Sequence, residues 1–226
     1  MSAGEIYSPG VKSLLALGAG RSHSSARFTP DHLAWPNYVV TCGLGESDVG
    51  QLMAVLSDVD LDHGEGKLCW ARVHAYRALG QLKAGAAGKA LVAAFHTAIR
   101  QKDARARQEL PAAMEMMGAG FCEDAIVALE DRSLDSYVHV VMASILAAIG
   151  QSTPKLRARC IQALMGALGC GPENDPRFNS GLILSLKLLN ASAADELIQH
   201  VCRNGWADER MLQYALQDSG PAKAPR

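Results

Sequence analysis

Aromatic residues are scarce in this chain. They make up 5% of its 226 residues, while hydrophobic residues of all kinds make up 49%. The core is therefore expected to consist mainly of Ala, Leu, Val, Ile and Met. Alanine is the strongest helix former, and its small side chain lets neighbouring helices approach closely. The composition favours closely packed helices.

The chain also lacks an excess of charge of either sign. Its 22 Lys and Arg residues nearly balance its 23 Asp and Glu residues, which gives a formal net charge of −1. Such a chain has no overall attraction for nucleic acid or for an anionic membrane surface. We therefore predict neither a nucleic-acid partner nor a membrane partner, although an uneven distribution of charge still allows a local basic face.

No two of the six cysteines form a C-x-x-C pair. Most of them lie in apolar stretches, which predicts buried thiols in a reducing compartment. The apolar run at 11–19 contains Lys12 and is shorter than a membrane-spanning helix. No basic segment precedes this run, which argues against a signal peptide. We expect a soluble, cytoplasmic protein.

Signatures of common enzymes and metal sites are missing. The chain has no H-E-x-x-H, G-x-S-x-G or P-loop motif, and Gly18-Ala19-Gly20 lacks the third glycine of a dinucleotide-binding loop. The segment 58–64 alternates carboxylates as a calcium loop does, but its glycine comes one position late and Cys69 stands where the bidentate glutamate belongs. His200 and Cys202 are too close on a helix to share a zinc ion. We predict a protein that is not an enzyme and holds no metal or cofactor.

The chain does contain a recurring unit of two amphipathic helices joined by a short turn. The clearest copy runs from Trp70 to Gly80, turns at 81–85 and continues as a helix over 87–99. Similar breaks, each separated from the next by the length of one helical hairpin, lie at Gly80, Gly118, Gly150 and Asn190. Self-similarity at this period is typical of stacked helical repeats.

This repeat predicts an all-α fold, an α-solenoid of about five helical hairpins that coil as a right-handed superhelix. We predict a loop and capping segment over 1–28, the solenoid over 29–217 and a disordered tail over 218–226. Ser47, Thr153 and Ser192 stand at the expected starts of helices as capping residues, and Pro111 lies inside an expected helix.

The pattern Ala75-x-x-Ala78-Leu79-Gly80, followed by a second amphipathic helix, resembles the HEAT-like repeats named after the phycobilisome lyases. This likeness covers about residues 29–205. A closer likeness, to a group of bacterial HEAT-like proteins, lies in Tyr7-Ser8-Pro9, Leu14-Leu15-Ala16-Leu17-Gly18, Trp35-Pro36-Asn37-Tyr38, Gly43-Leu44-Gly45 and the segment 70–82. The segment 100–107 departs from that group, because it is basic here and acidic there. The resemblance implies a fold more strongly than an activity.

The second helix of each hairpin would line the concave surface of such a stack. Its polar and charged residues are therefore the candidate binding residues: Lys89, His96, Arg100, Glu123, Asp124, Lys155, Arg157, Arg159, Gln199 and Arg203. The sign of the charge alternates between repeats, which suits a protein partner better than a phosphate backbone.

A second candidate is a recognition patch of Trp70, His74 and Arg77. The three residues lie at helical spacing, and Trp and Arg are favoured in interfaces. The alternative is that Trp70 packs between repeats and that His74 bonds a loop backbone.

These observations predict a non-catalytic scaffold that binds another protein. One role that such a scaffold would suit is that of an immunity or inhibitor protein that neutralises a bacterial toxin or effector. The alternative is a HEAT-like enzyme or nucleic-acid-binding module, similar to DNA glycosylases or bilin lyases. A glycosylase-like groove needs one continuous basic surface, which the alternating charges do not provide.

Overall fold

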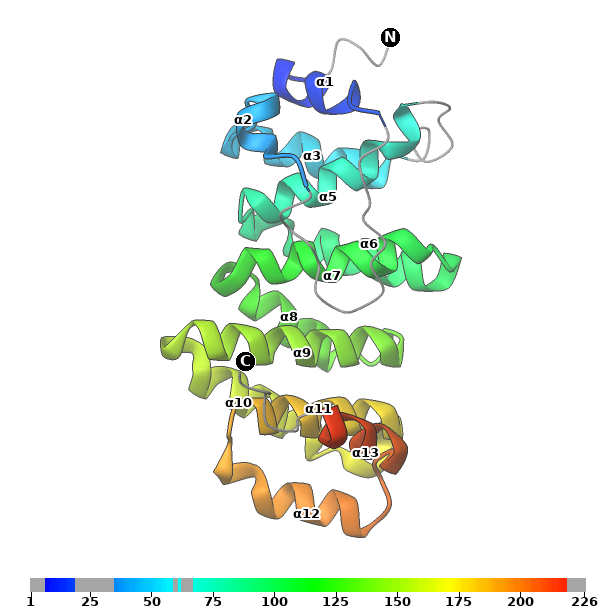
Figure 1. Ribbon diagram of the computed structural model, residues 1–226, viewed down its shortest axis with the longest axis vertical. Helices are drawn as coiled ribbons and strands as arrows, with labels where there is room; N and C mark the ends of the chain where they lie inside the picture. Colours follow the sequence, from blue (N-terminus) through cyan, green and yellow to red (C-terminus); the bar gives the residue numbers. More distant parts are fainter. Residues whose placement is uncertain (1–6, 19–34, 59–60, 62–66, 219–226) are drawn as a thin grey trace, which may run out of the picture. The chain divides into compact units, whose positions relative to one another are not determined.

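The computed structural model describes residues 7–18, 35–58, 61 and 67–218. Every regular element in these ranges is a helix (Figure 1), which confirms the predicted all-α fold. None of these helices is long and apolar enough to cross a membrane. The predicted tail after residue 218 and most of the loop at 58–64 lie outside the described ranges.

The chain divides into two compact units, residues 1–124 and 125–226, and the division falls within helix α8. A single continuous solenoid stays a prediction.

Helix α5 is the central element of the first unit. It packs against α3 on one side and α7 on the other (Figure 1), and α6 packs against both α3 and α7. The elements of this unit are, in chain order, α1 (Pro9–Leu15), α2 (Tyr38–Cys42), η3 (Glu46–Asp48), α3 (Val49–Ser57), η4 (Leu68–Trp70), α5 (Ala71–Gln81), η5 (Gly85–Ala87), α6 (Gly88–Gln101), α7 (Ala104–Met117), η6 (Gly118–Phe121) and the start of α8 (Cys122–Glu130). Nearly the whole of α5 is buried, which explains its high content of small residues.

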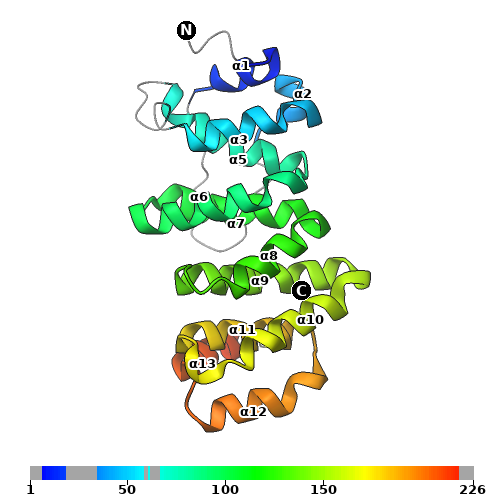
Figure 2. The ribbon, with the colours of Figure 1, turned by 180° about the vertical axis from the view of Figure 1, so that it is seen from behind.

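Helix α9 is the corresponding central element of the second unit. It packs against α10 and α11, α12 packs against α10, and α13 packs against α11, an arrangement that Figure 2 shows from behind. After the rest of α8, the elements are α9 (Ser136–Ser152), α10 (Pro154–Leu168), η7 (Gly171–Glu173), α11 (Pro176–Leu188), η8 (Ser192–Ala194), α12 (Asp195–Arg203) and α13 (Glu209–Asp218).

Two of the predicted helix breaks come one or two residues early, because α5 ends at Gln81 and α9 at Ser152. Gly80 lies inside α5 and Gly150 inside α9, and both are buried. A Cβ atom on Gly80 would lie 2.7 Å from the backbone oxygen of Ala113 in α7. Gly80 is therefore required for the close approach of α5 and α7. The other two breaks are correct, since Gly118 and Asn190 have positive φ angles.

Two of the three predicted capping residues are wrong, since Ser47 and Ser192 lie inside 3-10 helices. Thr153 does precede the first residue of α10, as predicted, but its side chain makes no capping hydrogen bond. Aspartate side chains cap three of the long helices instead, because a carboxylate accepts hydrogen bonds from the free amides of the first turn. These caps are Asp103 of α7, Asp135 of α9 and Asp175 of α11.

Candidate functional site

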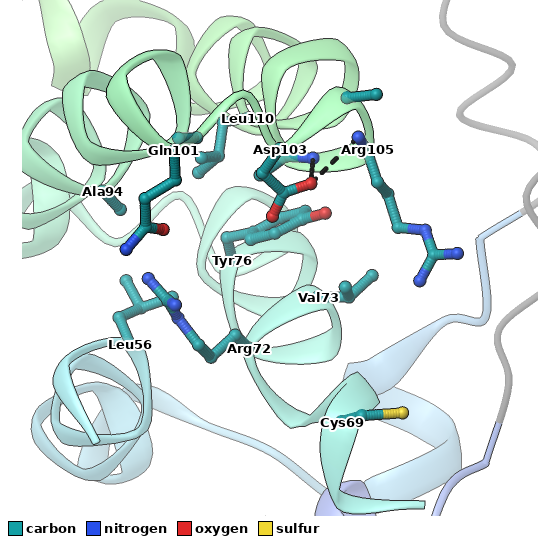
Figure 3. Close-up of a pocket in the computed structure, with 13 residues that line it drawn as sticks. Leu56, Cys69, Arg72, Val73, Tyr76, Ala94, Gln101, Asp103, Arg105 and Leu110 are labelled. Carbon is teal, nitrogen blue, oxygen red and sulfur yellow. Dashed lines mark hydrogen bonds between the residues drawn. The ribbon is translucent and has the colours of Figure 1, made fainter. Parts of the chain in front are cut away.

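The first unit contains a pocket of about 340 Å³ between α5, α6 and the start of α7. Figure 3 shows Tyr76 at its centre, with Arg72 and Gln101 pointing toward one another on one side and Arg105 on the other. Apolar side chains of four helices complete the wall, namely Leu56, Val73, Ala94, Ala98 and Leu110. Two guanidinium groups thus flank a largely apolar floor.

A cation–π contact positions Arg105. Its guanidinium carbon lies 3.8 Å from the centre of the Trp70 ring, which stands at the end of η4. Such a contact favours the charged group by about 0.5–1 kcal/mol at an exposed site. Within the described residues, no carboxylate lies at ion-pair distance from Arg105. Its charge is therefore held in place without being neutralised.

Asp103 is the one acidic residue that lines the pocket. Its Oδ1 accepts hydrogen bonds from the backbone N–H groups of Arg105 and Ala106, both at 3.0 Å, as the dashed lines in Figure 3 show. The carboxylate therefore caps α7. Two arginines and this one aspartate are the charged residues among the described residues that line the pocket.

Beneath the pocket, Tyr76 joins a buried ion pair between α5 and α7. Nε of Arg77 donates to Oε2 of Glu109 and Nη2 donates to Oε1, both at 2.7 Å, and the Tyr76 hydroxyl donates to Oε2 at 3.1 Å. Burial lowers the pKa of Arg77, but its hydrogen bonds and ion pair with Glu109 outweigh that effect and raise it. Burial, reinforced by Glu109, raises the pKa of Tyr76 well above its usual value.

One nitrogen of this cluster has no hydrogen-bond partner within the described residues, Nη1 of the fully buried Arg77. The indole ring of Trp35 partly compensates, since its centre lies 5.2 Å from the guanidinium carbon. The bidentate ion pair of Arg77 with Glu109 holds α5 and α7 in register. Because both charges are engaged with one another, the pair is structural.

His74 connects α5 to two other segments. Its Nε2 lies 2.9 Å from the carbonyl oxygen of Gly18, and its Nδ1 lies 2.7 Å from the hydroxyl of Tyr38 in α2. A carbonyl only accepts, so Nε2 carries the proton and the Tyr38 hydroxyl donates to Nδ1. Burial lowers the pKa of His74, and the nearby charge of Arg77 lowers it further. Burial also raises the pKa of Tyr38, to about 12. The neutral forms of both groups are stabilised.

The recognition patch predicted at Trp70, His74 and Arg77 does not form a surface. His74 is 1% exposed and Arg77 is 0% exposed, because both side chains bond within the unit. The alternative interpretation of His74 is confirmed, since it binds the backbone of Gly18 after α1. Trp70 is half-buried and contributes to the pocket only through Arg105.

The candidate binding residues of the first unit lie on α6 and α8. Lys89, Arg100 and Glu123 are exposed, and His96 and Asp124 are half-buried. Burial raises the pKa of Asp124, while the nearby Lys89 lowers it and Glu123 raises it further. The structure thus brings Lys89 and Asp124 together. It places none of the five in the pocket.

In the second unit, the candidate residues lie on α10 and α12, which pack against one another. Lys155, Arg159, Gln199 and Arg203 are exposed. Arg157 is half-buried, and its Nη2 donates to the carbonyl oxygen of Leu189 at the end of α11. Arg157 therefore satisfies a helix terminus and is better explained as a structural residue.

Several residues of the site do not appear among the sequence candidates, notably Arg72, Tyr76, Gln101, Arg105 and Glu109. The pairing of Trp70 with Arg105 depends on helix packing, so no local pattern reveals it. Arg77 and Glu109 do leave a signal, because each interrupts an otherwise apolar buried helix face. A buried charge on each of two helices indicates that they pair.

Chemistry that depends on a metal finds no support in the arrangement of the side chains. No group of three or more His, Cys, Asp or Glu residues is placed to hold a metal ion in the part of the chain that the structure describes. The geometry of the pocket instead suits recognition of a negatively charged group.

Comparisons with protein-family models, with curated proteins and with solved structures found no match to this chain.

Proposed function

We propose that this protein is a non-catalytic HEAT-like scaffold that binds another protein along its concave face, through exposed charged side chains of the second helices. In this proposal the helical hairpins stack as a right-handed α-solenoid, and the second helices of the hairpins provide the binding surface. One biological role consistent with it is neutralisation of a bacterial toxin or effector, as an immunity protein does.

The observation that carries the proposal is an exposed cation where helix stability does not favour it. Lys155 lies in the first turn of α10, which has no acidic residue and no side-chain cap. A positive charge at a helix N-terminus costs about 0.3–1 kcal/mol through the helix dipole. An exposed cation that destabilises the helix in which it lies is better explained by a role in binding a negatively charged group of a partner.

The charges of the second helices support a protein partner over a nucleic acid. Exposed acids lie on other second helices than α10, for example Glu123 on α8 and Glu196 on α12. Mixed charge selects and steers a protein partner, whereas a phosphate backbone requires cations throughout.

The test is affinity capture from the native cell at low salt, with the double variant Lys155→Glu/Arg159→Glu in parallel. We expect a protein partner at a stoichiometric level, a loss of at least about tenfold in its capture with the variant, and an unchanged melting temperature. Arg132→Glu, which alters an exposed ion pair of the same unit, is the matched control and should retain the partner. Absence of a stoichiometric protein partner, or a salt-sensitive shift with DNA instead, would contradict the proposal.

A further inference from the structure

We propose that protonation of His74 releases α1 and α2 from α5, so that these N-terminal helices of the first unit form an acid-sensitive element. His74 lies on α5 and is 1% exposed. Each of its ring nitrogens holds a different segment, the carbonyl oxygen of Gly18 after α1 and the hydroxyl of Tyr38 in α2. One neutral imidazole thus joins both helices to α5, a role that does not depend on the scaffold function proposed above.

The hydrogen bonds around His74 leave no acceptor for a second ring proton. Nε2 already donates to the carbonyl oxygen of Gly18, so the second proton goes to Nδ1, which accepts from the Tyr38 hydroxyl at 2.7 Å. Protonation therefore places two hydrogens between Nδ1 and the hydroxyl oxygen. Within the described residues, Nδ1 is the one hydrogen-bond partner of that hydroxyl. Turning the hydroxyl away from Nδ1 thus leaves its hydrogen without an acceptor.

The charges near His74 also oppose its protonation. Burial lowers the pKa of His74 most, and the fully buried guanidinium of Arg77 on the same helix lowers it further. Glu109 of α7 acts in the opposite direction, but both of its oxygens are bonded to Arg77. On α2, burial raises the pKa of the Tyr38 hydroxyl and of the Cys42 thiol, so both are neutral at neutral and acidic pH. A charged His74 would therefore lie beside Arg77 as a second buried cation.

In the described part of the chain, the other elements that pack against α5 bring no carboxylate to His74. Helix α3 contains no charged residue, and Asp58, which follows it, bonds to Tyr7 before α1. The charged or titratable residues in or beside α1 and η4 are exposed, namely Lys12, Lys67 and Cys69. The side chain of Lys67 passes close to Gly18, and its charge has the same sign as that of a protonated histidine.

The two sides of α5 are held with different strength, which explains why α1 and α2 separate first. On one side, the ion pair of Arg77 with Glu109 joins α5 to α7 through two hydrogen bonds of 2.7 Å. On the other side, α1 has seven residues and α2 has five, and Val39 and Val40 of α2 are 41% and 77% exposed. Short elements that bury little apolar surface open at a lower free energy than the whole unit.

The first experiment is hydrogen exchange of the full chain between pH 7.5 and 5, with each rate divided by the intrinsic rate at that pH. The amides of Lys12, Tyr38 and Thr41, which are hydrogen-bonded in the structure, report on α1 and α2. We expect their opening constants to rise by up to about 30-fold, because the open state binds a proton that the closed state excludes. Amides of α5 should have smaller opening constants at every pH. Equal opening constants in α1, α2 and α5 would show that the unit unfolds as a whole and would overturn the proposal.

The variant His74→Gln identifies the group that titrates. Its amide keeps one donor and one acceptor at this position and does not bind a proton in this pH range. It should retain the protection of α1 and α2 at pH 7.5 and remove its loss at pH 5. His139→Gln is the matched control, because His139 is a buried histidine of the second unit whose Nε2 also lies 2.9 Å from a backbone carbonyl oxygen. If the pH dependence persists in His74→Gln, another group causes it, such as Asp48, which bonds to Ser8, and the proposal fails.

An NMR titration of the imidazole nitrogens tests the same mechanism without any substitution. At pH 7.5 we expect His74 to be neutral with its proton on Nε2, as its contact with Gly18 requires. The amide signals of Tyr38 and Thr41 should change to those of the open state over the pH range in which His74 gains its second proton. A His74 that becomes charged while the signals of α2 stay unchanged would overturn the proposal.

Discussion

The two units of the chain bury their polar groups in different ways. In the first unit, a charged pair, Arg77 with Glu109, lies between α5 and α7, and a neutral histidine joins three segments beside it. In the second unit, the most deeply buried polar groups are amides and hydroxyls, foremost Asn179 and Ser180. A buried ion pair is costly to break and sensitive to protonation, whereas a neutral network depends only on its hydrogen bonds.

The network of the second unit joins α11 to the segments that surround it. Nδ2 of Asn179 donates to the carbonyl oxygens of Gly171 at 2.8 Å and Trp206 at 2.7 Å, and its Oδ1 accepts from Asn174 at 2.8 Å. Ser180 accepts from the backbone N–H of Asp208 at 2.8 Å. One amide side chain thus links the segment before α11 to the segment before α13. In the first unit, the ion pair between Arg77 and Glu109 makes the corresponding link between α5 and α7.

The largest expected effect is that of Glu109→Ala. It leaves the fully buried guanidinium of Arg77 without its counter-charge, which should lower the free energy of unfolding by about 3–5 kcal/mol. Urea denaturation followed by circular dichroism measures this loss. Glu173→Ala is the matched control, because its ion pair with Arg132 is exposed and should contribute about 1 kcal/mol or less. Equal losses for the two variants would show that the buried pair has no special role.

Asn179→Ala should have the next largest effect. The carbonyl oxygens of Gly171 and Trp206 lose their side-chain donor, and an unsatisfied buried group costs about 1–3 kcal/mol. The same denaturation measurement applies. Asn204→Ala, which removes an exposed hydrogen bond to His200, should cost less. If Asn179→Ala lowers the free energy of unfolding as much as Glu109→Ala does, the buried ion pair is no more costly to break than the neutral network.

Gly80→Ala should destabilise the first unit more than Gly150→Ala destabilises the second. The new methyl group at Gly80 meets backbone atoms of Ala113, which cannot move without displacing α7, and overpacking of this kind costs about 1–3 kcal/mol. The gain in helix propensity, about 0.5–1 kcal/mol, offsets part of the loss.

At Gly150 the nearest atom is the end of the flexible Leu189 side chain, at 2.9 Å, which can rotate away. The free energy of unfolding of Gly150→Ala should therefore lie within about 1 kcal/mol of that of the natural chain. The opposite order of stability would contradict the close approach of α5 and α7.

The smallest expected effect is a dependence on pH that is specific to the first unit. Burial lowers the pKa of His74 below the value of 6.5 that it has when unfolded. The unfolded chain thus binds more protons than the folded chain just below pH 6.5, so stability is lost as the pH falls from about 6.5 toward the folded pKa. We expect His74→Gln to flatten the change in the free energy of unfolding between pH 7.5 and 5. An unchanged slope in this variant would show that His74 does not cause it.

Periodicity predicted the helices well and the polar interior poorly. The spacing of apolar residues predicted a helix over 87–99, which lies within two residues of the bounds of α6, because this helix buries a regular stripe. Gly80 and Gly150 lie one and two residues before the ends of α5 and α9. A sequence does not distinguish a glycine that ends a helix from one that permits contact between helices. The pocket could not be predicted from the sequence either, because Trp70 and Arg105 meet only after α5 and α7 have packed.

Hydrogen exchange of the complex with its partner is the most direct test of the function proposed here. Bound and free chains are compared amide by amide, with the Lys155→Glu/Arg159→Glu variant as reference. The account predicts slower exchange at the start of α10, residues 154–160, in the natural chain only. No change at α10 when the partner is bound, or equal slowing in the variant, would contradict it.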